Sequence, residues 1–215
     1  QVNTYTYGNQ SAPSVAMDNS GNFVVTWGSN GQDDYLDGIY AQRYTSTGSV
    51  AGSEFQVNTY TYGNQSAPSV AMDNSGNFVV TWQSNTQDRN GLGIYGQRYD
   101  STGLVAGSEF RVNTYTTNDQ NTPSVTIDNS GNFVVTWESD RQDDDGNGIY
   151  GQRYDSTGLV AGSEFQVNTY TYGNQSAPSV AMDSTGNFVV TWESSKDGNI
   201  GGINGQRYDS TGLVQ

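Results

Sequence analysis

Hydrophobic and polar residues alternate in short runs along this chain. In residues 22–27 the apolar side chains of Phe23, Val25 and Trp27 share one face, and residues 13–18 alternate in the same way. A period of two residues is typical of a β-strand that buries one face. No segment of useful length shows the period of an amphipathic helix. The pattern therefore predicts an all-β protein.

Polar, glycine-containing turns separate these runs. Residues 18–21 read Asp-Asn-Ser-Gly and predict a tight hairpin, because Gly21 can supply the positive φ that such turns need. A third run covers residues 38–44, and a fourth covers residues 53–59. Each unit is therefore predicted to be a four-stranded antiparallel meander.

The unit is repeated through the chain. The sequence Gln-Val-Asn-Thr-Tyr-Thr begins at residues 1, 56 and 166, and Arg111 replaces the glutamine in the remaining copy. Both the 4 Trp and the 4 Pro occur once per copy. A fixed period identifies a repeat architecture. We expect a single repeat domain, residues 1–215, with repeats 1–55, 56–110, 111–165 and 166–215.

Four-stranded units of about 40–50 residues are typical of β-propeller blades. The chain opens with the sequence of a fourth strand, residues 2–4, and ends soon after a third strand, residues 204–208. We therefore expect a four-bladed β-propeller of four-stranded antiparallel blades, whose last blade is closed by the N-terminal strand. This closure would remove two exposed sheet edges. A linear β-solenoid, and an open array whose strands pair between chains, are the alternatives.

Composition narrows the chemistry. The 215 residues include 8 Lys+Arg, 22 Asp+Glu, 0 His and 0 Cys, which gives a formal net charge of -14. The missing residue types exclude disulfides, thiolate or imidazole metal sites, and catalysis by His or Cys. The negative charge argues against nucleic acid as a partner, and no apolar run approaches the roughly 18 residues of a membrane span. We expect neither nucleic-acid binding nor membrane insertion.

Three segments recur through the chain: Gly-Asn-Phe-Val-Val-Thr-Trp, then Gly-Ile-Tyr-Gly-Gln-Arg-Tyr-Asp-Ser-Thr-Gly, then Gly-Ser-Glu-Phe-Gln-Val-Asn-Thr. This pattern resembles the tandem repeats of very large secreted bacterial proteins, which are common in cyanobacteria and often lie beside calcium-binding nonapeptide regions. The resemblance implies export, an extracellular surface or matrix role, and a propeller-like fold. The chain departs from it in having no nonapeptide calcium run of its own.

The loops that follow the second strands are acidic and vary between repeats. In a propeller they lie at the same end as the loops that enter each repeat, and variable loops on a constant scaffold indicate a contact surface. Calcium binds six to eight oxygens, so Ca²⁺ is a candidate ligand, although no loop has EF-hand spacing. A solvated acidic turn is the alternative. The candidate metal ligands are Asp33, Asp34, Asp37, Asp88, Asp140, Asp143, Asp144, Asp145 and Asp197.

Tyrosines in the entry loops are candidate contacts for a ligand or partner. Aromatic faces beside Asp, Asn and Gln suit sugars, and one site per blade would give multivalent binding. Glycans are therefore candidate partners. The tyrosines concerned are Tyr5, Tyr7, Tyr60, Tyr62, Tyr115, Tyr170 and Tyr172.

The tryptophans and four arginines, one per repeat, are predicted to join the blades. Trp27 alternates with Phe23 and Val25, which favours packing between neighbouring sheets. Arginine has five donors that can bridge carbonyls or carboxylates, and Asp18 and Glu54 are candidate partners. The inter-blade set is Trp27, Trp82, Trp137, Trp192, Arg43, Arg98, Arg153 and Arg207.

These features predict a non-enzymatic secreted protein, a structural or adhesive module of an extracellular matrix, appendage or filament. An enzyme is disfavoured because near-identical blades repeat one group, whereas catalysis needs an asymmetric site; paired carboxylates leave glycosidase chemistry open. Self-assembly is expected, because the terminal strand has the same sequence as its internal equivalents and can pair between chains. A lectin with one shallow site per blade and a calcium-stabilised spacer of a giant adhesin are the alternatives.

Overall fold

The computed structural model describes residues 1–33, 36–195 and 201–215 as an all-β molecule. Its strands form three four-stranded sheets and one three-stranded sheet. All neighbouring strands within a sheet are antiparallel. The described residues contain no helix, and so none with the length and apolar character to span a membrane.

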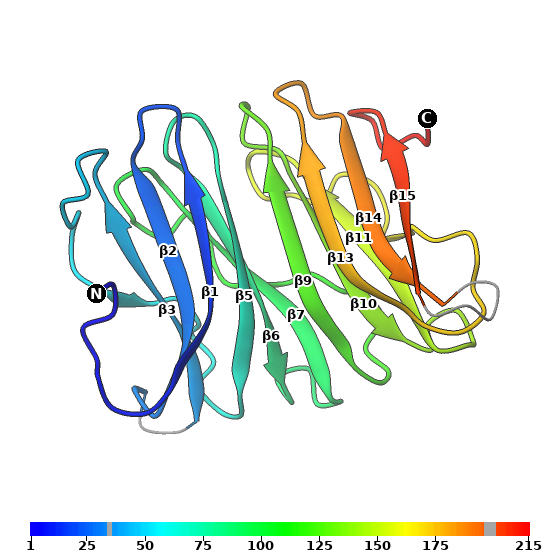
Figure 1. The fold of residues 1–215 in the computed structure, drawn as a ribbon, viewed down its shortest axis with the longest axis horizontal. Helices are drawn as coiled ribbons and strands as arrows, with labels where there is room; N and C mark the ends of the chain where they lie inside the picture. Colours follow the sequence, from blue (N-terminus) through cyan, green and yellow to red (C-terminus); the bar gives the residue numbers. More distant parts are fainter. Residues whose placement is uncertain (34–35, 196–200) are drawn as a thin grey trace.

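Each sheet follows the strand order of the chain, and we call the four sheets blades 1 to 4. The first strands lie side by side (Figure 1) and are β1 (Gln10–Met17), β5 (Gln65–Met72), β9 (Gln120–Ile127) and β13 (Gln175–Met182). The second strands are β2 (Phe23–Asn30), β6 (Phe78–Asn85), β10 (Phe133–Asp140) and β14 (Phe188–Ser194). The third strands are β3 (Asp37–Tyr44), β7 (Leu92–Tyr99), β11 (Asn147–Tyr154) and β15 (Gly202–Tyr208). The short fourth strands are β4 (Phe55–Gln56), β8 (Phe110–Arg111) and β12 (Phe165–Gln166).

The hairpin between the first two strands forms where the sequence places it. The Asp18 Oδ1 atom accepts the backbone N–H groups of Ser20 at 2.8 Å and Asn22 at 2.9 Å, and Gly21 has φ 86°. A side-chain bond to the N–H two residues on stabilises a turn, and glycine adopts positive φ without a Cβ clash. The other three blades repeat both bonds, so all four hairpins close alike.

The fourth strand is shorter than predicted. Strand β4 covers Phe55–Gln56 rather than residues 53–59. The ladder stops because the Asn58 side chain takes over the next bond: its Oδ1 accepts the Ile39 N–H at 2.7 Å, while Val57 N donates to Ile39 O at 2.7 Å. A side-chain amide here replaces a backbone carbonyl as acceptor.

The hydrophobic core lies between the blades. Val24 and Ile39 of blade 1 share one buried cluster with Val70, Val80 and Trp82 of blade 2. Two further clusters join blades 2 and 3 and blades 3 and 4 in the same way. The first strand of each following blade contacts the first three strands of the blade before it. The buried apolar clusters are therefore shared between successive blades.

The predicted closure of the last blade by the N-terminal strand is wrong. Strands β13, β14 and β15 form a three-stranded sheet, and residues 1–9 form no strand. The two termini lie at opposite ends of the row of sheets (Figure 1). Val2 is 37% exposed, whereas its equivalent Val57 is 2% exposed against β3. Because the N-terminal segment does not reach β15, the four blades form an open row.

Candidate functional site

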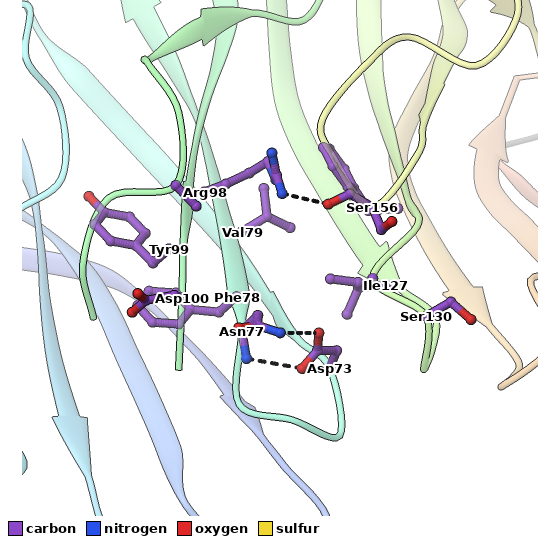
Figure 2. A pocket seen from close by; sticks show the side chains of 13 residues that line it. Asp73, Asn77, Phe78, Val79, Arg98, Tyr99, Asp100, Ile127, Ser130 and Ser156 are labelled. Carbon is purple, nitrogen blue, oxygen red and sulfur yellow. Dashed lines mark hydrogen bonds between the residues drawn. The ribbon is translucent and has the colours of Figure 1, made fainter. Parts of the chain in front are cut away.

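The two ends of the blades use their polar side chains differently. One end, the hairpin end, carries the turns between first and second strands. A groove of about 210 Å³ opens there between blades 2 and 3 (Figure 2). In its lining, Asn77 donates its N–H to Asp73 Oδ1 at 3.0 Å and its Nδ2–H to Asp73 Oδ2 at 2.8 Å. The polar groups here are engaged with one another.

An arginine crosses this groove in Figure 2. Arg98 Nη2 donates to Ser156 O of blade 3 at 2.5 Å, and Arg98 Nη1 donates to Thr157 O. Arg43 and Arg153 bond the following blade in the same way. The bonds go to backbone carbonyls rather than to the carboxylates that the sequence offered as partners. Three arginines thus tie successive blades together.

All four tryptophans are buried, at Trp27, Trp82, Trp137 and Trp192. The last three lie in the clusters that join successive blades. Because the rings of these three face the clusters, they form no surface on which a sugar ring could stack. The structure places these three in the packing between blades, whereas Trp27 lines a cavity on blade 1.

At the opposite end, the entry loop of each blade is bonded to the acidic loops. Asn85 N donates to Asn64 O at 2.9 Å within blade 2. Between blades, Leu92 N donates to Asp119 Oδ1 of the next entry loop at 2.9 Å. These bonds confirm the prediction that the entry loops and the acidic loops share one end, which we call the loop end.

Paired tyrosines stand on three of the four entry loops. Their ring centroids are 5.8–5.9 Å apart with interplanar angles of 60–61°, and the pairs are Tyr5–Tyr7, Tyr60–Tyr62 and Tyr170–Tyr172. The second ring of each pair is largely exposed, at 76% for Tyr7, 60% for Tyr62 and 70% for Tyr172. Blade 3 has Tyr115 but Thr117, and so lacks the second ring. Each pair therefore presents one aromatic ring to solvent, packed edge-on against another.

The loop beneath the tyrosine pair of blade 2 is fixed from inside. Gln65 is fully buried and donates its Nε2–H groups to Tyr62 O at 3.2 Å and Gly63 O at 3.1 Å. Asn58 Nδ2 donates to Tyr60 O at 2.8 Å and to Gln65 Oε1 at 3.2 Å. Both backbone carbonyls and side-chain amides are satisfied, so the tyrosine pair stands on an ordered base.

Two carboxylates and a buried tyrosine, Asp88, Glu109 and Tyr95, lie on the same blade. Glu109 Oε2 accepts the Thr59 N–H at 2.6 Å, and Glu109 Oε1 accepts the Gln87 Nε2–H at 2.6 Å. The Oδ2 atom of Asp88 is buried and has no hydrogen-bond partner among the described residues. One carboxylate is therefore held rigidly, and the other carries an unused acceptor.

A glycine makes room for Asp88. A Cβ at Gly93 would stand 2.9 Å from Asp88 Oδ2 and 3.3 Å from Tyr95 Cε2. The equivalent glycine–aspartate pairs are Gly38–Asp33 and Gly148–Asp143. The missing side chain thus lets the carboxylate lie at the edge of the tyrosine ring.

The carboxylates affect the neighbouring phenol. Burial raises the pKa of Tyr95 to about 12; the negative charge of Asp88 adds to this rise, the positive charge of Arg111 opposes it, and Glu109 adds a smaller rise. Tyr60, which follows the Thr59 whose N–H bonds Glu109, also raises the pKa of Tyr95. Burial and nearby carboxylates likewise raise the pKa of Tyr150 in blade 3. These phenols stay protonated at neutral pH and can donate a hydrogen bond.

The acidic loops form no metal centre in the described parts of the chain. No three of the described Asp and Glu side chains gather closely enough to hold an ion. They are engaged singly: Asp37 Oδ1 accepts from Asn30 Nδ2 at 2.7 Å, and Asp145 Oδ2 accepts from Gly173 N at 3.3 Å. The candidate ligands that do not converge are Asp33, Asp37, Asp88, Asp140, Asp143, Asp144 and Asp145. Asp34 and Asp197 lie outside the described residues.

Sequence reasoning missed Tyr95 as a site residue and offered the glutamates as arginine partners. A usable signal was the constant interval of 22 residues between the glutamine and glutamate that bond each other, Gln87 and Glu109 in blade 2. In the last repeat Asn204 stands in place of the tyrosine.

No protein-family model and no curated protein matches this chain. Its fold is similar to that of an endo-arabinase from Bacteroides thetaiotaomicron, with a TM-score of 0.56 and 14% identity over 94% of this chain and 77% of that one. It is also similar to an α-L-arabinofuranosidase from Fusarium graminearum, with a TM-score of 0.64 and 9% identity over 94% and 63%. It is similar as well to a Hadza microbial sialidase, with a TM-score of 0.63 and 12% identity over 94% of this chain and 45% of that one. At these identities the likeness concerns the fold alone: the four sheets are arranged as blades of the β-propeller type, in the open row described above.

These comparisons contradict the predictions of a non-enzymatic structural or adhesive module and of no enzyme, because the similar structures are glycoside hydrolases. The sequence-based prediction treated the blades as equivalent. They are not: blade 3 replaces the exposed tyrosine with Thr117, and blade 4 replaces the buried tyrosine with Asn204. The loop ends of the blades therefore differ in their aromatic residues.

Proposed function

We propose that this chain is a carbohydrate-active protein that binds neutral glycans at the loop end and hydrolyses them. The observation that carries the proposal lies in blade 2: the Tyr60–Tyr62 pair follows Thr59, whose N–H bonds Glu109, and Asp88 lies at the edge of the Tyr95 ring. The fold shared with an arabinase, an arabinofuranosidase and a sialidase supports the same class of substrate.

The exposed tyrosine supplies the binding surface. The apolar face of a sugar ring stacks on an aromatic ring, while nearby polar groups fix its orientation. The ring of Tyr62 lies 5.9 Å from that of Tyr60, which limits its movement. The same arrangement recurs at Tyr7 in the neighbouring blade, so one extended glycan chain has two stacking positions.

Charge selects among glycans. The chain has a formal net charge of -14, and carboxylates surround the proposed site. Like charges at an interface disfavour binding. A neutral pentose or hexose polymer is therefore preferred over a sialylated, anionic one.

The carboxylates supply the chemistry. Most glycoside hydrolases use a pair of Asp or Glu residues on either side of the scissile bond. Asp88 Oδ2 has no hydrogen-bond partner among the described residues, and we assign the Asp88 carboxyl to give a proton to the glycosidic oxygen as its C–O bond breaks. Glu109, held by Thr59 and Gln87, is assigned to take a proton from the water that adds to the anomeric carbon.

Binding and hydrolysis are tested together on a panel of arabinan, other neutral oligosaccharides and a sialylated oligosaccharide. Calorimetry should give the tightest binding to a neutral glycan, and Tyr62→Ala should weaken it about three- to ten-fold. Thr117→Ala, at the equivalent position of blade 3, is the matched control and should leave binding unchanged. Asp88→Asn should keep binding but abolish release of reducing ends.

The result that overturns the proposal is absence of both binding and release across the whole panel. Equal losses for Tyr62→Ala and Thr117→Ala would remove the tyrosine pair from the site. Hydrolysis that survives in Asp88→Asn would remove that carboxylate from the reaction.

A further inference from the structure

The first and last blades each expose a face that the inner blades bury. On blade 1, Val15 is 62% exposed, whereas its equivalent Val70 is 7% exposed against blade 1. On blade 4, Ile203 is 77% exposed, whereas its equivalent Ile149 is fully buried. In Figure 1 these two faces lie at opposite ends of the row. The molecule therefore has two separate, unpartnered apolar faces.

The internal interfaces show what each face binds. Ile39 packs with Val80 and Trp82 of the next blade. Residues 1–27 are identical to residues 56–82, so blade 1 presents the same surface that blade 2 presents to Ile39. On blade 1 that surface holds a cavity of about 220 Å³ lined by Pro13, Val25 and Trp27 among others. Its natural occupant is an isoleucine such as Ile203.

Polar groups on the free faces of blades 1 and 4 also correspond to those of the internal interfaces. The side chains of Arg43, Arg98 and Arg153 lie within 2.7 Å of the Cβ positions of Gly103, Gly158 and Gly212. The corresponding glycine of blade 1, Gly48, has the same positive φ but nothing within 4 Å. The corresponding arginine, Arg207, is exposed at the other end of the molecule. Arg207 on blade 4 and the space beside Gly48 on blade 1 thus correspond to the two sides of the internal arginine contact, and they lie on different faces.

A second hydrogen bond is divided in the same way. Val70 N donates to Ser14 Oγ of the preceding blade at 3.3 Å, and the next two interfaces repeat this bond. The equivalent donor on blade 1 is Val15 N, and the equivalent acceptor on blade 4 is the side chain of the exposed Ser179. No internal interface brings these two together. Both of these internal polar contacts have one half on each free face.

The N-terminal segment completes the match. Val57 and Asn58 pair with Ile39 on the edge of blade 1, just before the chain enters blade 2. Val2 and Asn3 are the same residues at the start of blade 1. A blade 1 seated on blade 4 would bring them to Ile203, and so would add the missing outer pairing to β15.

We propose that a second copy of this chain docks its blade 1 on blade 4 of the first, head to tail. The interface repeats the one already present three times in the chain, with Ile203, Arg207 and Ser179 on one side and Val15, Gly48 and Val2 on the other. Such a contact is heterologous, because the two surfaces differ and each copy keeps one of each. Two or more copies therefore join in one direction.

Paired surface variants test this arrangement. Ile203→Asp removes one face and Val15→Asp removes the other, and both positions are exposed in the single chain, so folding should be unchanged by circular dichroism. The unmodified chain should form dimers or larger species in sedimentation at micromolar concentration, whereas each variant alone should be a monomer. Mixed in equal amounts, the two variants should form a one-to-one dimer through the faces they retain.

Two further variants refine the test. Leu213→Asp is the matched control, because Leu213 and its internal equivalent Leu104 are both largely exposed, and association should be unchanged. Arg207→Ala should weaken association about ten-fold through loss of charge-assisted bonds. A chain that stays monomeric at high concentration overturns the proposal, whether blade 4 is then covered within the chain or by further repeats. So does a mixture of the two variants that fails to pair.

Discussion

The hairpin end and the loop end are built from the same kinds of residue but use them in opposite ways. At the hairpin end Asp73 accepts hydrogen bonds from Ser75 N, Asn77 N and Asn77 Nδ2, and Arg98 spans the groove to the next blade. At the loop end Asp88 keeps a buried Oδ2 without a partner. Satisfied polar groups stabilise a fold, whereas an unsatisfied buried acceptor is costly and is typical of functional sites. Asp73 at the hairpin end is thus fully engaged within the fold, whereas Asp88 at the loop end, where we propose that a glycan binds, keeps an unused acceptor.

The largest effect on stability is expected at alkaline pH, where both ends of the molecule should unfold together. Burial raises the pKa of Tyr95 at the loop end and of Tyr208, near the hairpin end, to about 12. A pKa raised above the unfolded value of 10 means that folding favours the protonated phenol. This stabilisation is complete below pH 10 and is lost as the pH rises towards 12. Spectrophotometric titration should show phenol ionisation and unfolding together in that range; ionisation of all phenols near pH 10 in a folded chain would contradict this.

Exchanging one aspartate at each end separates stability from activity. Asp73→Asn should lower the free energy of unfolding by about 1–3 kcal/mol, because an amide places a donor against donors. Asp88→Asn should change it by less than about 0.5 kcal/mol, since one oxygen there accepts no bond. Urea denaturation measures both. Similar losses for the two variants would abolish the distinction between the ends.

A glycine substitution tests how closely the loop end is packed. Gly93→Ala places a Cβ 2.9 Å from Asp88 Oδ2 and should destabilise the fold by about 1–2 kcal/mol while reducing glycan hydrolysis. Gly202 is the equivalent residue of blade 4 and has nothing within 4 Å, so Gly202→Ala is the matched control and should be neutral. Thermal melts compare the two variants directly, and equal melting temperatures would show that Asp88 moves aside freely.

The smallest effect concerns acid pH at the hairpin end. The Thr102 side chain and the backbone N–H groups that bond Asp100 lower the pKa of that carboxyl below its usual 3.8. A lowered pKa gives stabilisation that is present above about pH 4 and is lost as the pH falls below it. The melting temperature should therefore drop below pH 4, and Asp100→Asn should flatten that dependence slightly. A melting temperature independent of pH in this range would argue against these bonds.

The repeat made most of the fold predictable. The period of two in residues 22–27 became β2, and the Asp-Asn-Ser-Gly turn became a hairpin with Gly21 at φ 86°. Both are local features, which sequence patterns report well. The open row was not predictable. Whether the ring closes depends on the angle between stacked blades and on the number of blades. Those quantities are set by packing at Ile39 and Trp82, and identical residues in each copy do not reveal them.

The candidate site was predicted in part. The entry-loop tyrosines and acidic loops were assigned to one end, and the structure brings them together there. The roles of the acidic residues were not predictable, because the sequence does not show that Gly93 admits Asp88 beside Tyr95 while other carboxylates bond singly to loop amides.

The most direct measurement is a nuclear magnetic resonance titration of the isotope-labelled chain with a neutral arabino-oligosaccharide. We expect shift changes to concentrate on the loop end of blades 1 and 2, around Tyr7, Tyr62 and Tyr95, with the hairpin end unchanged. Tyr62→Ala should remove most of the changes in blade 2. Shift changes confined to the hairpin-end groove around Arg98, or none at saturating sugar, would contradict the assignment of the loop end as the site of carbohydrate action.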